Sequence, residues 1–177
     1  VMGDRSFEEQ ASAEEKQQMA DIVTKSLEGG AFGFSTNRFE PHKAPDGRSI
    51  PGTFAEPDEL AVISKAVAQR NGLMQSVGAS PDVMEAIANE GSRLLFSYGT
   101  QAEPGAGAKS ARWLEQFSED RDVTADTHVR SSGLLLSLST KFTIRGEAWK
   151  QLNEANVAQG LRLIDDADFV AQLVAEA

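Results

Sequence analysis

Residues 57–98 read PDELAVISKAVAQRNGLMQSVGASPDVMEAIANEGSRLLFSY, and this stretch decides the fold. A helix is predicted to begin near Pro57, because proline suits the first turn of a helix. The apolar side chains of this helix recur at helical spacing, at Leu60, Ile63 and Val67. Asn71–Gly72 ends the helix, and the short apolar run Leu73–Val77 then predicts a strand.

The same pattern occurs a second time within this stretch. Ser80–Pro81 is a strong N-cap and first-position pair, so another helix is predicted, ending near Gly91. Leu94–Tyr98 predicts the next strand. Helices and strands that alternate at this spacing are typical of parallel sheets with right-handed crossovers. The fold class is therefore α/β, with a barrel and an open sheet as the two alternatives.

The alternation extends toward the N-terminus. Ser12 and Glu15 form a capping box, which predicts a helix that ends at Gly29–Gly30. Ala31–Ser35 predicts a short buried strand. Residues 36–55 then contain many turn residues and no apolar period, and a loop of about 20 residues in a compact domain is often functional.

The alternation also extends toward the C-terminus. Gly99–Gly107 predicts a second loop, and a helix containing Trp113 follows it. Val123–Val129 predicts a strand, and Gly133–Leu138 is a further apolar segment. Two closing helices are predicted around Trp149 and Leu152 and around Phe169, Val170, Leu173 and Val174.

These elements amount to about four or five βα units of roughly 30 residues each. We expect one α/β domain over residues 1–177. A closed barrel of eight units takes about 250 residues, so this chain is too short for a closed barrel of that size.

Composition limits the function classes. The net charge of −10 repels phosphate backbones, so we expect no nucleic-acid partner. No apolar run approaches the roughly 20 residues of a membrane helix, and no secretion signal is visible, so we expect no membrane contact. Cysteine is absent, which excludes disulfides and thiolate nucleophiles and fits a cytoplasmic protein.

Histidine is the most informative residue count. His42 and His128 are the two histidines of the chain, and they are far apart in the sequence. A hydrolytic zinc site takes about three protein ligands, mostly histidine with an acidic residue. Composition therefore argues against a metal site built from this chain alone, and we assign neither metal ligands nor catalytic residues.

Two segments contain residues suited to a binding site. Ser35 and Thr36 should lie at the carboxyl end of a strand, where parallel α/β folds build their sites. His42, Asp46 and Arg48 lie in the long loop that follows. This loop is either an active-site lid, in which Arg48 binds a substrate carboxylate, or an ordinary polar connection.

A third segment carries alternating polar residues. Asp126, His128 and Arg130 would point to one face if residues 123–129 form a strand. An Asp-x-His pair on one face suits a metal ligand or a proton shuttle. A polar strand edge without a site is the interpretation we favour.

Five segments resemble the amidohydrolase superfamily, specifically the N-acyl-D-amino-acid deacylases (D-aminoacylases) and their relatives. They are VMGDR (1–5), LEGGAFGFSTNR (27–38), HKAPDGRSIPGTFAEPDEL (42–60), THVRSSGLLLSL (127–138) and LIDDADFVAQLVAEA (163–177). The resemblance is most specific from Leu27 to Leu60. It implies a metal-dependent (β/α)8 barrel, most often a zinc enzyme, that hydrolyses the amide bond of N-acylated D-amino acids.

The resemblance also implies where a small-molecule substrate would bind. Ser35, Arg38, His42 and Arg48 become candidates for recognition of its carboxylate or acyl group. The chain departs from the family at two metal-ligand positions, because Val77 and Tyr98 stand where histidines are expected. The His-x-His pair of an early strand is also missing. The resemblance therefore implies a partial (β/α)8 barrel, in which the segments correspond to the middle third of the family's larger barrel.

Three interpretations follow. In the first interpretation, the chain is part of an amidohydrolase whose metal ligands lie elsewhere. In the second, it is an inactive amidohydrolase-like binding or scaffold domain. The third is an unrelated α/β protein. A barrel portion should leave an unpaired sheet edge, so the first interpretation also predicts self-association.

Overall fold

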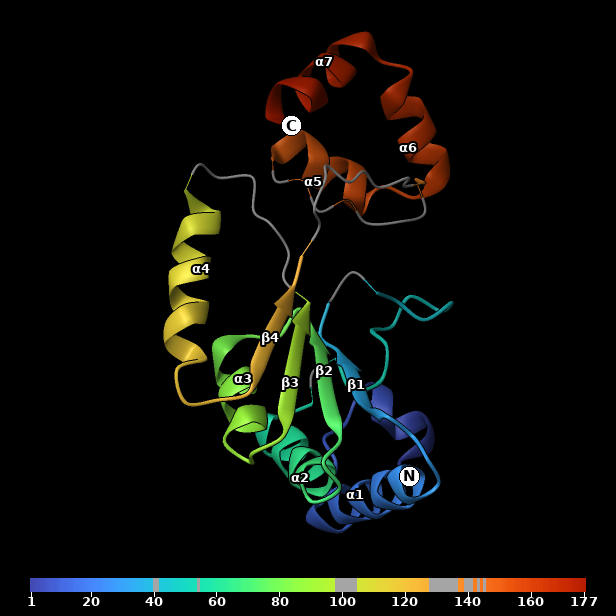
Figure 1. Ribbon diagram of the computed structural model, residues 1–177. Coiled ribbons are helices and arrows are strands. Elements are labelled where there is room, and N and C mark those ends of the chain that lie inside the picture. The colour runs from blue at the N-terminus through green and yellow to red at the C-terminus, as the bar shows by residue number, and fades with distance from the viewer. Residues whose placement is uncertain are drawn as a thin grey trace. The chain divides into compact units, whose positions relative to one another are not determined.

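The structure is a computed structural model (Figure 1). It describes residues 1–39, 42–53, 55–97, 105–127, 137–138, 142, 144 and 146–177. The chain divides into two compact units, Val1–Arg130 and Ser131–Ala177. The sheet belongs to the first unit, whereas the single domain expected from the sequence spans residues 1–177.

Helices and strands alternate along the first unit, which confirms the α/β class. In chain order its elements are the 3-10 helix η1 (Gly3–Phe7), α1 (Ala13–Glu28), β1 (Gly33–Asn37), α2 (Pro57–Ala68), β2 (Leu73–Val77), α3 (Pro81–Ala88), β3 (Arg93–Ser97), α4 (Ala106–Phe117) and β4 (Val123–Asp126). Strand β2 has the predicted bounds, and β1 begins two residues later than predicted. Helix α1 begins at its predicted capping box, in which Ser12 and Glu15 exchange hydrogen bonds of 3.2 and 2.9 Å.

The four strands are parallel and lie in the order β1-β2-β3-β4 (Figure 1). Every crossover therefore moves one strand over in the same direction, and right-handed crossovers then place all the helices on one face. An open, doubly wound sheet reverses its strand order instead. The winding is compatible with a partial α/β barrel.

The face of the sheet that packs on the helices is the core face. Its apolar side chains come from alternate strand positions and include Phe34, Met74, Leu94, Phe96 and Val123. They pack against Leu60, Ile63, Val83 and Ile87 of α2 and α3, which are almost completely buried. Burial of apolar surface on this one face therefore forms the core of the first unit.

The opposite face is the open face, formed by the other alternate positions. At the level of Ser35 it contains Gln75, Leu95 and Thr124, which are neighbours in the strand register. Ser35 is exposed, and Gln75 and Leu95 are half-buried. Beside Ser35, the backbones of β1 and β2 approach so closely that a Cβ at Gly33 would lie 1.9 Å from the carbonyl oxygen of Leu73, so this position requires glycine.

Two buried serines in the first unit differ in their hydrogen bonding. The Ser64 hydroxyl on α2 lies 2.7 Å from the Ile87 carbonyl oxygen and 2.7 Å from the Ser92 hydroxyl. The Ser76 hydroxyl on β2 is also buried, but no hydrogen-bond partner for it is found in the described part of the chain. Most buried polar groups in proteins have a partner, so Ser76 is unusual.

The second unit contains three helices among its described residues, α5 (Glu147–Glu154), α6 (Val157–Ile164) and α7 (Ala167–Glu176). Ala148, Leu152, Phe169 and Leu173 form its core, and the Trp149 indole donates a 2.9 Å hydrogen bond to the Leu173 carbonyl. Two helices were predicted here, and α6 is the additional one. Across the described residues of both units, no helix has the length and apolar character needed to cross a bilayer.

Candidate functional site

The carboxyl ends of the four strands meet at one edge of the sheet (Figure 1). Parallel α/β folds build their binding sites at this edge. The register places Asn37, Val77, Ser97 and Asp126 side by side there, on the open face. Three of these four side chains are polar, although parallel strands usually carry apolar residues on both faces.

Three polar side chains on the open face form a hydrogen-bonded row that crosses three strands. The Ser35 hydroxyl donates to the Gln75 side-chain carbonyl, and the Gln75 amide donates to the Ser97 hydroxyl at 3.1 Å. We call these residues the polar row. It is uncharged and presents hydroxyl and amide groups near the carboxyl edge, so it suits a neutral polar group such as an amide.

His42 is held at the end of β1. Its Nδ1 is hydrogen-bonded to the Asn37 side-chain amide, whose oxygen also accepts a 2.8 Å hydrogen bond from the Phe39 backbone. The edge of the His42 ring meets the Phe39 ring, with 5.2 Å between the centroids. The predicted loop residue His42 is thereby brought to the carboxyl edge of the sheet.

Arg38 is hydrogen-bonded to the loop that follows β1. Its guanidinium donates to the carbonyl oxygens of Ala55 at 2.5 Å and Gly52 at 3.3 Å. Burial lowers the pKa of this guanidinium. The residue was predicted to recognise substrate, and the structure shows it bound to the backbone of its own chain.

Arg48 connects the loop to η1, which lies 44 positions earlier in the sequence. Its guanidinium forms ion pairs with Asp46 at 2.8 Å and Asp4 at 3.1 Å, and it lies 4.0 Å from the centre of the Phe7 ring. Hydrogen bonds from the Arg48 backbone and side chain lower the pKa of Asp46. Arg48 was also predicted to bind substrate, and its charge is here paired within the chain.

The third segment singled out in the sequence is described only in part. Asp126 ends β4 and is exposed next to Ser97 in the strand register. His128, Arg130 and Tyr98 lie outside the described residues. The interpretation of Asp126, His128 and Arg130 as one polar face therefore stays a prediction.

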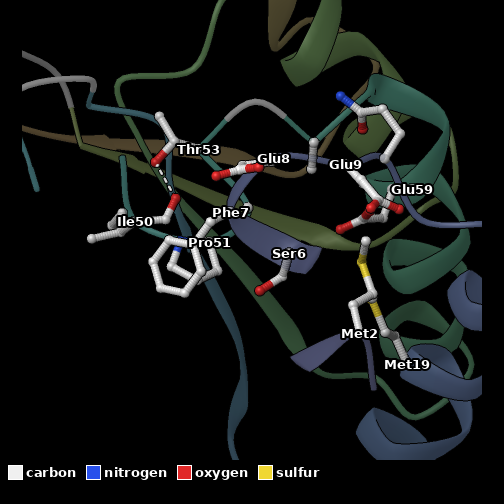
Figure 2. Close-up of a pocket in the computed structure, with 13 residues that line it drawn as sticks. Met2, Ser6, Phe7, Glu8, Glu9, Met19, Ile50, Pro51, Thr53 and Glu59 are labelled. Atoms are coloured by element: carbon white, nitrogen blue, oxygen red, sulfur yellow. Dashed lines mark hydrogen bonds between the residues drawn. The ribbon is translucent and has the colours of Figure 1, made fainter. Parts of the chain in front are cut away.

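A pocket of about 260 Å³ is lined by η1, the loop residues 50–53 and 55, the second turn of α1 and the first turn of α2 (Figure 2). Its lining includes Met2, Phe7, Met19, Ile50, Pro51 and Glu59. No local sequence pattern indicates this pocket, because the residues of its walls are distant in the sequence. Glu59 resembles an ordinary acidic residue in a first helical turn, and its burial is visible only in the structure.

The described residues do not fit the metal that the family resemblance implies. No group of three or more His, Cys, Asp or Glu side chains suited to a metal ion occurs among them. At the carboxyl edge the register offers an amide, a valine, a hydroxyl and one carboxylate. Zinc sites in hydrolases instead take histidine nitrogens and carboxylates.

Comparison with models of protein families, with curated proteins and with solved structures finds no match to this chain. Function is therefore inferred from the residues and from their arrangement.

Proposed function

We propose that this chain forms four consecutive βα units of an amidohydrolase-type (β/α)8 barrel, with the open face as part of the inner wall. The observation that carries the proposal is the combination of one-directional winding with a polar row on the helix-free face. Parallel sheets normally have both faces covered, and the inner face of a barrel is covered by its own further strands. Strands β1 and β4, which each pair with one strand among the described residues, are the edges where such strands would add.

The proposed activity is hydrolysis of a non-peptide C–N bond, such as the amide of an N-acyl-D-amino acid. Support comes from the resemblance of segments 1–5, 27–38 and 42–60 to the deacylases. In this proposal the polar row hydrogen-bonds the acyl or amide group. His42 lies at the entrance of the site, and Arg38 and Arg48 fix the loop that contains His42. The metal ligands would belong to strands outside residues 1–177.

Activity of the natural protein that contains this chain tests the proposal. We expect hydrolysis of N-acetyl-D-amino acids that a chelator abolishes. Gln75→Ala should lower kcat/KM roughly fivefold to tenfold, the effect of losing one neutral hydrogen bond. Gln116→Ala is the matched control, because Gln116 is exposed on α4 and lies off the sheet. Equal kcat/KM for both variants, or no hydrolysis, would contradict the proposal.

A second candidate is a binding domain of the same fold that has lost catalysis. It is favoured by Val77 at an expected ligand position and by the lack of a metal-binding group among the described residues. Such a domain would bind an N-acetyl-D-amino acid, and Gln75→Ala would weaken that binding, while the natural protein releases no acetate. Acetate release sensitive to chelator would exclude this candidate.

A further inference from the structure

Glu59 is a buried carboxylate that lines the pocket described above (Figure 2). The residue is 8% exposed, although it lies in the first turn of α2, where acidic residues are usually solvated. Among the described residues, no hydrogen bond or ion pair reaches its carboxylate. Buried carboxylates are almost always paired, so Glu59 lacks a partner that its position calls for.

The two nearest cations are already committed to other groups. The Lys16 ammonium lies 2.7 Å from the Asp58 carboxylate, and the Arg38 guanidinium donates to the Gly52 and Ala55 carbonyls. Burial raises the pKa of Glu59, and this effect outweighs the opposite influence of Lys16 and Arg38. A cation entering the pocket would therefore meet a carboxylate that lacks a direct counter-ion.

The other carboxylates of the pocket already have partners. Glu9 accepts a 2.8 Å hydrogen bond from Arg5, and Glu8 lies 3.8 Å from the Arg48 guanidinium. Both glutamates are largely exposed, so solvent screens their charges. Within the pocket, Glu59 is thus the carboxylate whose charge a ligand would neutralise most effectively.

Most of the remaining wall of the pocket is apolar, and Ser6, Gln10 and Thr53 are its uncharged polar side chains. Met2 and Met19 lie at the same end as Glu59 in Figure 2, and Phe7, Ile50 and Pro51 line the other end. Methionine is flexible and polarisable, so it adapts to ligands of different shape. A volume of about 260 Å³ lies just below the range of roughly 300–1,000 Å³ usual for drug-sized ligands, so the ligand should be small.

We propose that this pocket binds a small organic ammonium ion, whose charged nitrogen pairs with Glu59 and whose apolar part packs between Met2 and Met19. The net charge of −10 attracts such a cation and repels anions. The site differs from the polar row, which is uncharged and lies on the open face. The proposal therefore does not depend on the proposed hydrolase function.

Methionine methyl NMR on the full chain tests the site without any substitution. The probe is 2-phenylethylammonium, with 2-phenylethanol as its neutral counterpart. The chain has four methionines, of which Met2 and Met19 line the pocket whereas Met74 and Met84 are buried in the core. We expect the amine to shift the methyl signals of Met2 and Met19 in a saturable manner, and to leave the other two unchanged. No saturable shift, or equal binding of the alcohol, would overturn the proposal.

A matched pair of substitutions tests the role of the charge. Glu59→Gln should weaken amine binding about tenfold or more, since charge-assisted hydrogen bonds are the strong ones. Glu56→Gln should leave it unchanged, because Glu56 is exposed at the N-cap of the same helix. Removal of a buried unpaired charge should not impair folding, which the core methionine signals will report. Equal affinity of both variants would contradict the assignment of Glu59.

Because the readout is binding alone, failure here would leave the hydrolase proposal intact. Conversely, loss of the hydrolase proposal would not change the expected methyl shifts.

Discussion

On the core face of the sheet, Met74 and Leu94 are buried beneath the helices. On the open face, one position further along the same strands, Gln75 and Leu95 are half-buried. Apart from Thr36 and Ser76, the core face is apolar. It contributes most of the stability, because stability follows the apolar area removed from water. The open face instead satisfies its polar groups laterally, through the polar row. Each strand thus contributes a buried core residue and a half-buried open-face residue in alternation.

The largest expected effect concerns the core face. Leu94→Ala should lower the free energy of unfolding by about 3 kcal/mol, because a buried leucine leaves a cavity when truncated. Leu95→Ala, the adjacent residue on the open face, should cost about 1 kcal/mol, since it removes half-exposed apolar surface. Urea denaturation of the 177-residue chain measures both. Similar losses for the two leucines would mean that the faces do not differ as described.

The second prediction compares the two buried serines. Ser64→Ala should destabilise the chain by about 1–2 kcal/mol, because the Ile87 carbonyl and the Ser92 hydroxyl both lose the hydrogen bond that they form with the Ser64 hydroxyl. Ser76→Ala should be neutral or stabilising by up to about 1 kcal/mol, because it removes a buried hydroxyl that lacks a partner. Thermal or urea unfolding distinguishes them, and a large loss for Ser76→Ala would reveal a partner.

The third prediction tests the open face. Gln75→Ala should change the free energy of unfolding by about 1 kcal/mol or less, because the polar row is partly solvated. The same substitution is expected to impair recognition in the natural protein, which separates function from stability at this position. Gln116→Ala serves as the control for unfolding. A loss approaching that of Leu94→Ala would instead assign Gln75 a structural role.

The smallest expected effect concerns the helix layer that covers the core face. The hydrogen bond from Lys16 is the main reason why the pKa of Asp58 is lowered. A lowered native pKa stabilises the fold above the ordinary aspartate pKa of about 3.9, and this contribution disappears as pH falls through the native pKa.

Asp58→Asn should therefore cost a few tenths of a kcal/mol near pH 6, as expected for an ion pair whose carboxylate is exposed. The difference from the unsubstituted chain should shrink as pH falls below the ordinary aspartate pKa of about 3.9, and it should vanish once pH is below the lowered native pKa. The free energy of unfolding of both chains, measured from pH 6 down to pH 3, checks this prediction. Asp122→Asn, at an exposed position, is the control. A difference that does not change with pH would show that the Lys16 pair is not its cause.

The sequence predicted the core face well because its signals are local. The capping box at Ser12, the proline at Pro57 and the alternation within Leu73–Val77 each act over a few residues, and α1, α2 and β2 begin where predicted. The 3-10 helix η1 was missed because five residues are too few for a clear apolar period. Helix α6 was missed although Asn156 and Gln159 form the capping box that begins it.

The site was predicted less completely because its contacts are distant in the sequence. Ser35 was singled out, but its partner Gln75 is 40 positions away, and no local pattern marks Gln75 as the centre of the polar row. Arg38 and Arg48 were predicted to bind substrate, and that role stays a prediction. Their partners within the chain, however, depend on how the loop folds back.

The size of the natural protein that contains this chain tests the central claim most directly. Peptides mapped to the intact band from its native cell would give both the mass and the sequence coverage. We predict a species much larger than 19.0 kDa, with further βα units and a His-x-His strand upstream. A native species near 19.0 kDa would contradict the barrel, because the open face would then have no further strands to cover it.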